Sequence, residues 1–136
     1  NRNINVFYVT NRSIEKETLL NLQQTVDPSA TPNILLCKLE KPEWGSDKRS
    51  RRSEILKKNR VLLLIGDDYN DFCYIGKVTE EERLKKGKEY QNYWGKKWII
   101  LPNPLYGNWE RALYNYRTNI TQKEKQRLKF QSLIIN

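Results

Sequence analysis

Three carboxylates stand close together directly behind the most apolar stretch of the chain. Asp67, Asp68 and Asp71 follow the apolar run at residues 61–65, which Gly66 ends. A run without polar alternation is typical of a strand covered on both faces of a parallel α/β sheet. Carboxylates this close repel one another unless a cation lies among them, and hard oxygen ligands at the carboxyl end of a buried strand favour Mg²⁺. The simpler alternative is a solvated turn, because Asp, Asn and Gly are common turn residues.

A second predicted strand ends on a small hydroxyl group. Residues 3–10 are expected to form a buried strand that ends at Thr10 and is followed by Asn11 and Arg12. A threonine hydroxyl and free backbone N–H groups at the carboxyl end of a strand can hold phosphate oxygens, and Arg12 would add positive charge. Thr10 could equally cap the helix predicted over residues 15–24, so these residues leave both roles open.

A strongly basic segment follows the third predicted strand, at residues 33–39. Residues 46–52 contain four cations at the expected start of a helix, which Ser46 or Asp47 would cap. Cations at a helix N-terminus oppose the helix dipole, so a sequence that accepts them is expected to neutralise an anion. We assign that role to Lys48, directed at the carboxylates of the acidic turn. Most of residues 49–58 are assigned to a solvated basic face.

The composition fits one globular domain. The chain has 136 residues, of which 38% are hydrophobic and 30% charged, and no apolar run approaches the roughly 20 residues that span a bilayer. The net charge of +9 favours anionic partners without choosing among them. With no histidine and two cysteines outside any C-x-x-C spacing, a zinc site is not expected, and Cys37 is assigned to the core. The chain starts at Asn1 and has no Met, so we expect a processed or excised piece.

The remaining elements complete an α/β pattern. A helix is predicted over residues 80–93 and a strand over residues 98–101, which Pro102 stops. In the loop that follows, Tyr106 and Trp109 could stack on a base or pack on the domain, and we favour packing.

Four motifs occur in a fixed order along the chain. They are FYVTNR at residues 7–12, KRSRR at 48–52, GDDYNDF at 66–72 and LPNPLYGNWE at 101–110. Together they resemble the class C acid phosphatases, the lipoprotein e family of the haloacid dehalogenase superfamily, over residues 6–109. The resemblance implies a Rossmannoid three-layer α/β fold with a mainly parallel sheet. It also implies Mg²⁺-dependent hydrolysis of phosphomonoesters, typically nucleoside 5′-monophosphates, through an aspartyl-phosphate.

The resemblance assigns roles to matching residues of the first two motifs. Thr10 and the Asn11 backbone would hold the transferring phosphoryl group, with Arg12 beside them as a further substrate-binding residue. Lys48 would bind the substrate and act in catalysis by balancing the charge of the nucleophile and the phosphate. An extracytoplasmic location, whether secreted, periplasmic or lipid-anchored, is implied as well.

In the third motif, Asp67 would bind Mg²⁺ and Asp71 would act as its catalytic support. The family usually has Asn where this chain has Asp68, and Leu where it has Tyr69. The extra carboxylate of Asp68 would either tighten metal binding or face solvent.

The family's first motif, DxDxT, occurs nowhere in these residues. In the family it supplies the nucleophilic aspartate and the general acid, and it ends the central strand of the sheet. We therefore expect a fold that is incomplete at its central strand, with residues 1–110 as the carboxy-terminal part of the phosphatase domain and residues 111–136 as a basic extension. The expected partners are a phosphomonoester, the missing amino-terminal segment and, as one option, a second copy of the chain.

Two function classes follow. The first is the carboxy-terminal part of a Mg²⁺-dependent acid phosphatase that is inactive without the amino-terminal segment. The second is a basic nucleic-acid-binding module without catalytic activity, whose binding would fall steeply with salt. We favour the enzyme, because a basic module gives no reason for GDDYNDF behind an apolar strand.

Overall fold

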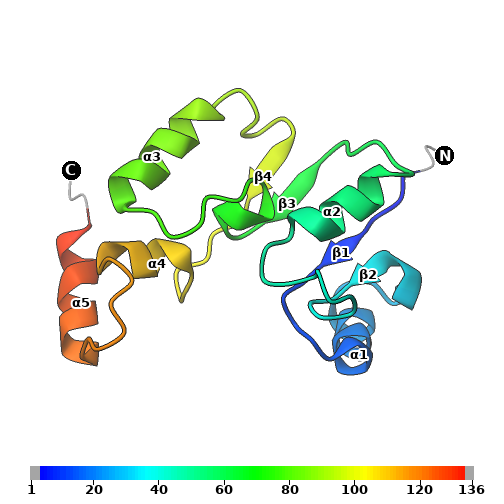
Figure 1. Ribbon diagram of the computed structural model, residues 1–136, viewed down its shortest axis with the longest axis horizontal. Helices are drawn as coiled ribbons and strands as arrows, with labels where there is room; N and C mark the ends of the chain where they lie inside the picture. Colours follow the sequence, from blue (N-terminus) through cyan, green and yellow to red (C-terminus); the bar gives the residue numbers. More distant parts are fainter. Residues whose placement is uncertain (1–3, 134–136) are drawn as a thin grey trace. The chain divides into compact units, whose positions relative to one another are not determined.

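The computed structural model describes residues 4–133 of a chain that divides into two compact units, an amino-terminal unit (residues 1–61) and a carboxy-terminal unit (62–136). In each unit short strands alternate with helices (Figure 1). In the amino-terminal unit β1 (Tyr8–Val9) pairs with β2 (Leu35–Leu36), and in the carboxy-terminal unit β3 (Leu64–Gly66) pairs with β4 (Trp98–Ile100). Both pairs are parallel, and in the described part of the chain they form two separate sheets. The fold is therefore α/β with short parallel sheets, consistent with a partial Rossmannoid fold.

The amino-terminal unit packs two helices with its sheet. They are α1 (Glu15–Thr25) and α2 (Arg49–Leu56), and a 3₁₀ turn, η1 (Pro32–Ile34), leads into β2. Tyr8 lies opposite Leu35 in the ladder, which continues where the Thr10 N–H donates to the Leu36 carbonyl at 3.1 Å. Leu35, Leu36 and the thiol of Cys37 are buried, so the core assignment of Cys37 is correct.

The carboxy-terminal unit follows the same strand and helix alternation. Its helices are α3 (Glu80–Glu89), α4 (Asn108–Leu113) and α5 (Gln122–Gln131). Helix α3 begins with a capping box, in which Thr79 and Glu82 satisfy each other's backbone N–H groups. Between the strands, Ile65 lies opposite Ile99, and the ladder extends to a bond of 2.7 Å from the Leu101 N–H to the Gly66 carbonyl.

An aromatic cluster forms the core of this unit. The ring centroid of Phe72 lies 5.2 Å from that of Trp94 and 5.5 Å from that of Trp98. Tyr69 stacks on Trp94 at 5.5 Å, and Tyr90 approaches Trp98 at 4.9 Å. Offset and edge-on pairs at these separations are the favoured arrangements of aromatic rings. The cluster therefore anchors the segment that follows β3 against the segment that precedes β4.

The last helix packs against its neighbour. The Lys129 ammonium forms an ion pair of 2.8 Å with Glu110 on α4 and lies 5.7 Å from the centre of the Trp109 ring. Helix α4 spans the boundary between residues 110 and 111, where the predicted domain meets its basic extension. That division stays a prediction. None of the helices in the described residues combines the length and the apolar composition needed to cross a bilayer.

The strands are shorter and more exposed than the sequence predicts. The strands predicted at residues 3–10, 33–39 and 98–101 each contain an observed strand, although residue 3 lies outside the described residues. The prediction that residues 61–65 are covered on both faces is wrong. Of that run, Leu64 and Ile65 belong to β3, and Ile65 is 60% exposed. A two-stranded sheet leaves much of its apolar strand surface in solvent, because burial of a parallel sheet requires further layers.

Candidate active site

The acidic turn is held together by Asp71. The Asp71 carboxylate accepts the backbone N–H groups of Asp67 and Asp68, both at 3.0 Å, and Asp68 in turn caps the 3₁₀ turn η2 (Tyr69–Asp71). A Cβ atom at Gly66 would collide with the Asp71 side chain, so the close approach requires glycine there. Asp71 thus positions the backbone around Asp67, and its catalytic role stays a prediction.

Asp68 joins the acidic turn to the loop that precedes α4. Its carboxylate accepts the backbone N–H of Asn70 at 2.9 Å and the backbone N–H of Asn108 at 3.2 Å. Burial alone would raise the pKa of Asp68, but these bonds and the nearby charge of Arg83 outweigh it, so the pKa lies below its ordinary value. Asp68 is therefore an ionised linker between the GDDYNDF and LPNPLYGNWE motifs and is not simply a solvent-facing charge.

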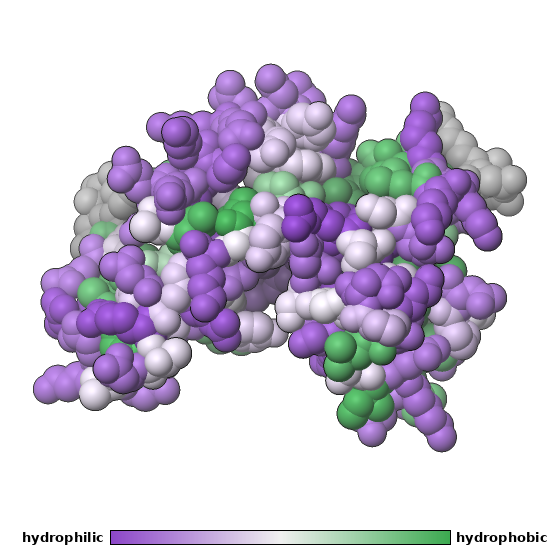
Figure 2. Space-filling model, viewed as in Figure 1, coloured by the Kyte–Doolittle hydropathy of each residue, from purple (hydrophilic) through white to green (hydrophobic). Residues whose placement is uncertain are grey.

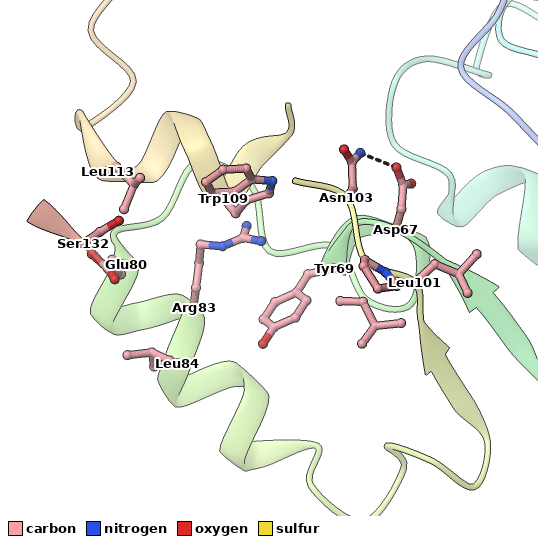
Figure 3. Close-up of a pocket in the computed structure, with 12 residues that line it drawn as sticks. Asp67, Tyr69, Glu80, Arg83, Leu84, Leu101, Asn103, Trp109, Leu113 and Ser132 are labelled. Carbon is pink, nitrogen blue, oxygen red and sulfur yellow. Dashed lines mark hydrogen bonds between the residues drawn. The ribbon is translucent and has the colours of Figure 1, made fainter. Parts of the chain in front are cut away.

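Asp67 presents its carboxylate at the carboxyl end of β3. The side chain is exposed, and it accepts a bond of 2.5 Å from the Asn103 side-chain amide, as Figure 3 shows. Asn103 comes from the loop after β4, so both strands of this sheet deliver a polar side chain to the same edge. Of the three carboxylates, Asp67 is the one that the turn does not use internally.

The acidic turn does not gather its carboxylates around one point. Among residues 4–133, no group of three or more His, Cys, Asp or Glu side chains is arranged to hold a metal ion. The reason is that Asp68 and Asp71 accept backbone N–H groups. The Asp67 carboxylate is a ligand type that fits a hard cation, whereas Asn103 turns its NH₂ group toward Asp67 and its oxygen toward the Leu105 N–H. The binding of Mg²⁺ at Asp67 therefore stays a prediction.

A cavity of about 470 Å³ opens beside Asp67. In Figure 3 the side chains of Arg83, Tyr69 and Trp109 point into it. The Arg83 guanidinium carbon lies 4.8 Å from the centre of the Tyr69 ring. Within the described residues, Arg83 Nη1 and Trp109 Nε1 are buried N–H donors without an acceptor. The cavity thus has apolar walls and two buried donors, and each such donor costs about 1–3 kcal/mol until it is paired.

The two aromatic residues of the last motif behave differently. Trp109 is half-buried in the cavity wall, as the packing prediction requires. Tyr106 is 68% exposed, so that prediction is wrong for Tyr106. Tyr106 lies in the loop directly before Gly107, the N-cap residue of α4.

The end of β1 carries free donors. Thr10 Oγ1 accepts the Arg12 backbone N–H at 3.2 Å, which leaves the hydroxyl proton available to donate. The following helix α1 begins at Glu15 with Ile14 as its N-cap residue, so Thr10 does not cap it. Arg12 is exposed at this end of the strand. The open choice between capping and another role for Thr10 is therefore settled against capping.

A buried arginine ties this strand end to α2. Arg51 has 0% exposure and donates to the Thr10 carbonyl, to Asn11 Oδ1 at 2.7 Å and to the Gly45 carbonyl at 2.9 Å. The Asn11 side-chain amide also donates to the Ser46 carbonyl at 3.1 Å. The prediction of a solvated basic face over residues 49–58 is wrong for Arg51. Its guanidinium is turned inward because it donates to Thr10 and Asn11, which lie more than thirty-five residues away in sequence.

Lys48 lies next to these contacts. It is the N-cap residue of α2 and half-buried, whereas the sequence predicts Ser46 or Asp47 as the cap. Asp47 instead accepts the Arg49 backbone N–H at 2.9 Å and its Nε at 2.7 Å. The amino-terminal unit therefore brings Thr10 and Asn11 together with the loop that leads into Lys48. The carboxy-terminal unit holds Asp67 and Asp71, and the convergence of all of these residues on one point stays a prediction.

Sequence reasoning missed the residues that hold the two turns. Arg51 was hidden within a basic run, and Asn103 and Asn108 within a loop of turn-forming residues. A usable signal for Arg51 is its spacing, because it lies four residues before Ile55 on the face of α2 that carries the apolar side chain.

Comparison with known proteins identifies the family of this chain. Residues 1–109 match the family model described as HAD superfamily, subfamily IIIB (Acid phosphatase). The solved structure of the class C acid phosphatase from Bacillus anthracis is similar, with a TM-score of 0.80 and 28% identity. A crystal structure of that phosphatase with tungstate bound matches equally well, with a TM-score of 0.80 and 28% identity. Each match covers 97% of this chain but 55% of the other, so the present chain spans little more than half of that length.

Proposed function

Because the chain belongs to subfamily IIIB of the HAD superfamily, the acid phosphatases, we propose that it is the carboxy-terminal part of a Mg²⁺-dependent phosphomonoester hydrolase. The observation that carries this proposal is that both β1 and β3 end in a turn whose polar groups suit the binding of phosphate or of a metal ion. Strand β1 ends in the donors of Thr10 and Asn11, and β3 ends in the outward carboxylate of Asp67. Phosphoryl transfer requires little from a protein beyond positioning and charge stabilisation, which these groups can supply.

Each of these residues has a defined task in the proposed reaction. The Thr10 hydroxyl and the Asn11 N–H orient the phosphoryl oxygens, and the Lys48 ammonium offsets their negative charge. Asp67, which Asn103 orients by a hydrogen bond, would hold Mg²⁺, and the ion would supply further positive charge against the phosphoryl group when bound. Asp71 keeps the Asp67 backbone in place through the two bonds to the turn N–H groups.

The nucleophile comes from outside this chain. A carboxylate of the amino-terminal segment attacks phosphorus, the bond from phosphorus to the ester oxygen breaks, and the alcohol leaves with a proton from the general acid of the same segment. Water then hydrolyses the aspartyl-phosphate and releases inorganic phosphate. The carboxylates of the acidic turn do not replace this group. Asp67 is directed toward the proposed metal position, and Asp68 and Asp71 accept backbone N–H groups.

Exposed apolar surface supports the docking of such a segment. Beside β3, Leu62 and Leu63 are 51% and 46% exposed, and Ile65 is 60% exposed. Figure 2 shows hydrophobic patches of this kind reaching a surface that is otherwise mostly hydrophilic. The unpaired donors of Arg83 and Trp109 add two polar anchor points in the cavity. A strand of that segment added at the free edge of β3 would cover these apolar residues and extend the sheet.

Substrate and location follow from the resemblance to the lipoprotein e family. We assign nucleoside 5′-monophosphates as the substrate class and an extracytoplasmic site of action. A panel of phosphomonoesters at equal concentration tests the substrate class, since a preference for nucleotides over simple sugar phosphates is expected.

Reconstitution tests the proposed activity. The 136-residue chain is assayed with a chromogenic phosphomonoester and Mg²⁺, with and without a separate segment that carries DxDxT. We expect no turnover by the chain alone, turnover with the segment, and loss of that turnover in Asp67→Asn. Hydrolysis by the chain alone that Asp67→Asn abolishes would place the nucleophile within these residues and refute the proposal.

A further inference from the structure

Arg51 is a charged side chain in an unusual position. It is fully buried, and its three acceptors are the Thr10 carbonyl, the Asn11 side-chain oxygen and the Gly45 carbonyl. All three acceptors are neutral, so the contacts are directional hydrogen bonds and not ion pairs. Burying a guanidinium is costly, and a planar fork of donors is suited to fixing several acceptors at once. Arg51 therefore fixes the relative positions of the end of β1 and the loop before α2.

The bond to the Thr10 carbonyl also fixes the direction of the next N–H. Cis peptide bonds are absent from the described residues, and in a planar trans peptide the C=O and N–H groups point in opposite directions. Since the Thr10 carbonyl points at Arg51, the Asn11 N–H points away from it. Among the described residues no hydrogen bond uses this N–H, and Asn11 is exposed, so the N–H is available to an acceptor from outside the chain.

The side chains on both sides of this peptide are restrained as well. Asn11 is held between Arg51 and the Ser46 carbonyl, at 2.7 Å and 3.1 Å. Thr10 Oγ1 accepts the Arg12 N–H at 3.2 Å, which leaves the hydroxyl proton for another acceptor. A peptide clamped in this way presents two donors with little freedom to reorient, which is the condition for strong anion binding.

We infer that Arg51 is a positioning residue of the phosphoryl site: it directs the Asn11 N–H and the Thr10 hydroxyl toward a phosphate oxygen without touching the phosphate itself. The inference rests on the proposed function for the identity of the anion. Arg51 contributes by holding the peptide after Thr10 in place and not by its charge. A lysine that keeps the charge therefore does not replace it. A single ammonium cannot reach three acceptors that Arg51 contacts with two nitrogens.

Binding of inorganic phosphate to the 136-residue chain tests the inference by calorimetry. Arg51→Lys is compared with wild type and with Arg60→Lys, which makes the same change at an exposed position. We expect phosphate affinity to fall about tenfold or more in Arg51→Lys, to fall as far in Arg51→Met, and to stay unchanged in Arg60→Lys. Equal affinity of Arg51→Lys and wild type would overturn the inference, as would the absence of any phosphate binding by the wild-type chain.

Kinetics of the reconstituted enzyme separate positioning from folding. Arg51→Lys is expected to raise KM and the competitive inhibition constant of phosphate by the same factor. A purely structural role would lower kcat through a smaller folded fraction and leave both constants unchanged, and that result overturns the inference. If the Arg51 variants do not fold, Asn11→Ala decides the matter, because it removes one contact of Arg51 and leaves the buried arginine in place. Weaker phosphate binding by folded Asn11→Ala supports the inference, and unchanged binding overturns it.

The outcomes distinguish this inference from the proposed function. If reconstitution gives no turnover but the chain binds phosphate in an Arg51-dependent way, the proposed function fails and the positioning role stands. If reconstitution gives turnover that is indifferent to Arg51→Lys, the proposed function stands and the positioning role fails.

Discussion

Replacing Asp68 with asparagine is expected to loosen the acidic turn by about 1–3 kcal/mol. The two oxygens of Asp68 accept the backbone N–H groups of Asn70 at 2.9 Å and Asn108 at 3.2 Å. In Asp68→Asn one oxygen becomes an NH₂ group that cannot accept, so one N–H loses its partner, and the other bond loses its charge. Hydrogen bonds to charged groups contribute about 1.5–3 kcal/mol and neutral ones about 0.5–1.5 kcal/mol. The half-buried position of Asp68 places the loss toward the middle of this range.

Thermal unfolding of the 136-residue chain at pH 7 measures this loss. For a chain of this size, 1 kcal/mol corresponds to roughly 3–5 °C in Tm. Asp47→Asn is the matched control, because Asp47 also accepts a backbone N–H but sits at an exposed pair with Arg49. The double variant Asp68→Asn/Asn108→Asp should recover part of the lost stability, since it again places a carboxylate opposite an amide. A Tm of Asp68→Asn equal to that of wild type would refute the role assigned to Asp68.

The pH dependence provides an independent check on the same residue. Burial opposes ionisation of Asp68, yet its hydrogen bonds and the charge of Arg83 lower its pKa below the ordinary value of 3.8. A carboxyl whose pKa is lower in the folded state stabilises the fold above its unfolded pKa and loses that effect as the pH falls through its folded pKa. The difference between wild type and Asp68→Asn should therefore be constant from about pH 7 to pH 5 and shrink below about pH 4. A difference that persists unchanged at pH 3 would contradict this account.

Further expectations concern the charge, docking and thiol chemistry of the chain. Lys48→Met should lower turnover of the reconstituted enzyme about a hundredfold or more, whereas the same change at exposed Lys57 should stay within about twofold; equal effects would count against the charge-balancing role. Arg83→Met should leave the chain folded but weaken binding of the amino-terminal segment by about tenfold or more in calorimetry, because the segment loses a charged donor. The burial of Cys37 raises the pKa of its thiol to about 11, so at pH 8 an alkylating reagent should modify Cys73 first, as peptide mass spectrometry would show. Modification of Cys37 as fast as Cys73 in the folded chain would be inconsistent with that burial.

The order of elements was readable from the sequence because it depends on local patterns. The helix predicted over residues 15–24 is observed as α1, and the strand predicted over residues 98–101 is observed as β4 (Trp98–Ile100). The extent and burial of strands depend on which neighbours pair with them, and a sequence that lacks the central strand gives no local sign of that loss. Ile65 has the residue type and context of a buried position and is nevertheless 60% exposed.

The residue types of the candidate site were predictable from the sequence, but the partners of each residue were not. The sequence shows three carboxylates and indicates a shared cation, whereas the structure assigns them different partners. Asp71 and Asp68 accept backbone N–H groups, and Asp67 faces outward. Arg51 was unpredictable for the same reason, since its acceptors come from β1 and from a distant loop. Local pattern reveals which chemistry is available, and long-range hydrogen bonding decides which groups remain available to perform it.

Each unit organises its own turn through its own hydrogen bonds. In the amino-terminal unit Arg51 fixes the peptide after Thr10, and in the carboxy-terminal unit Asp71 fixes the backbone around Asp67. Under the proposed function, the amino-terminal segment would then contribute a nucleophile, a general acid and a strand that covers exposed residues such as Ile65. We expect a short segment that carries DxDxT and pairs with the free edge of β3 to be sufficient for turnover, and the same motif placed in a sequence of low strand propensity to fail.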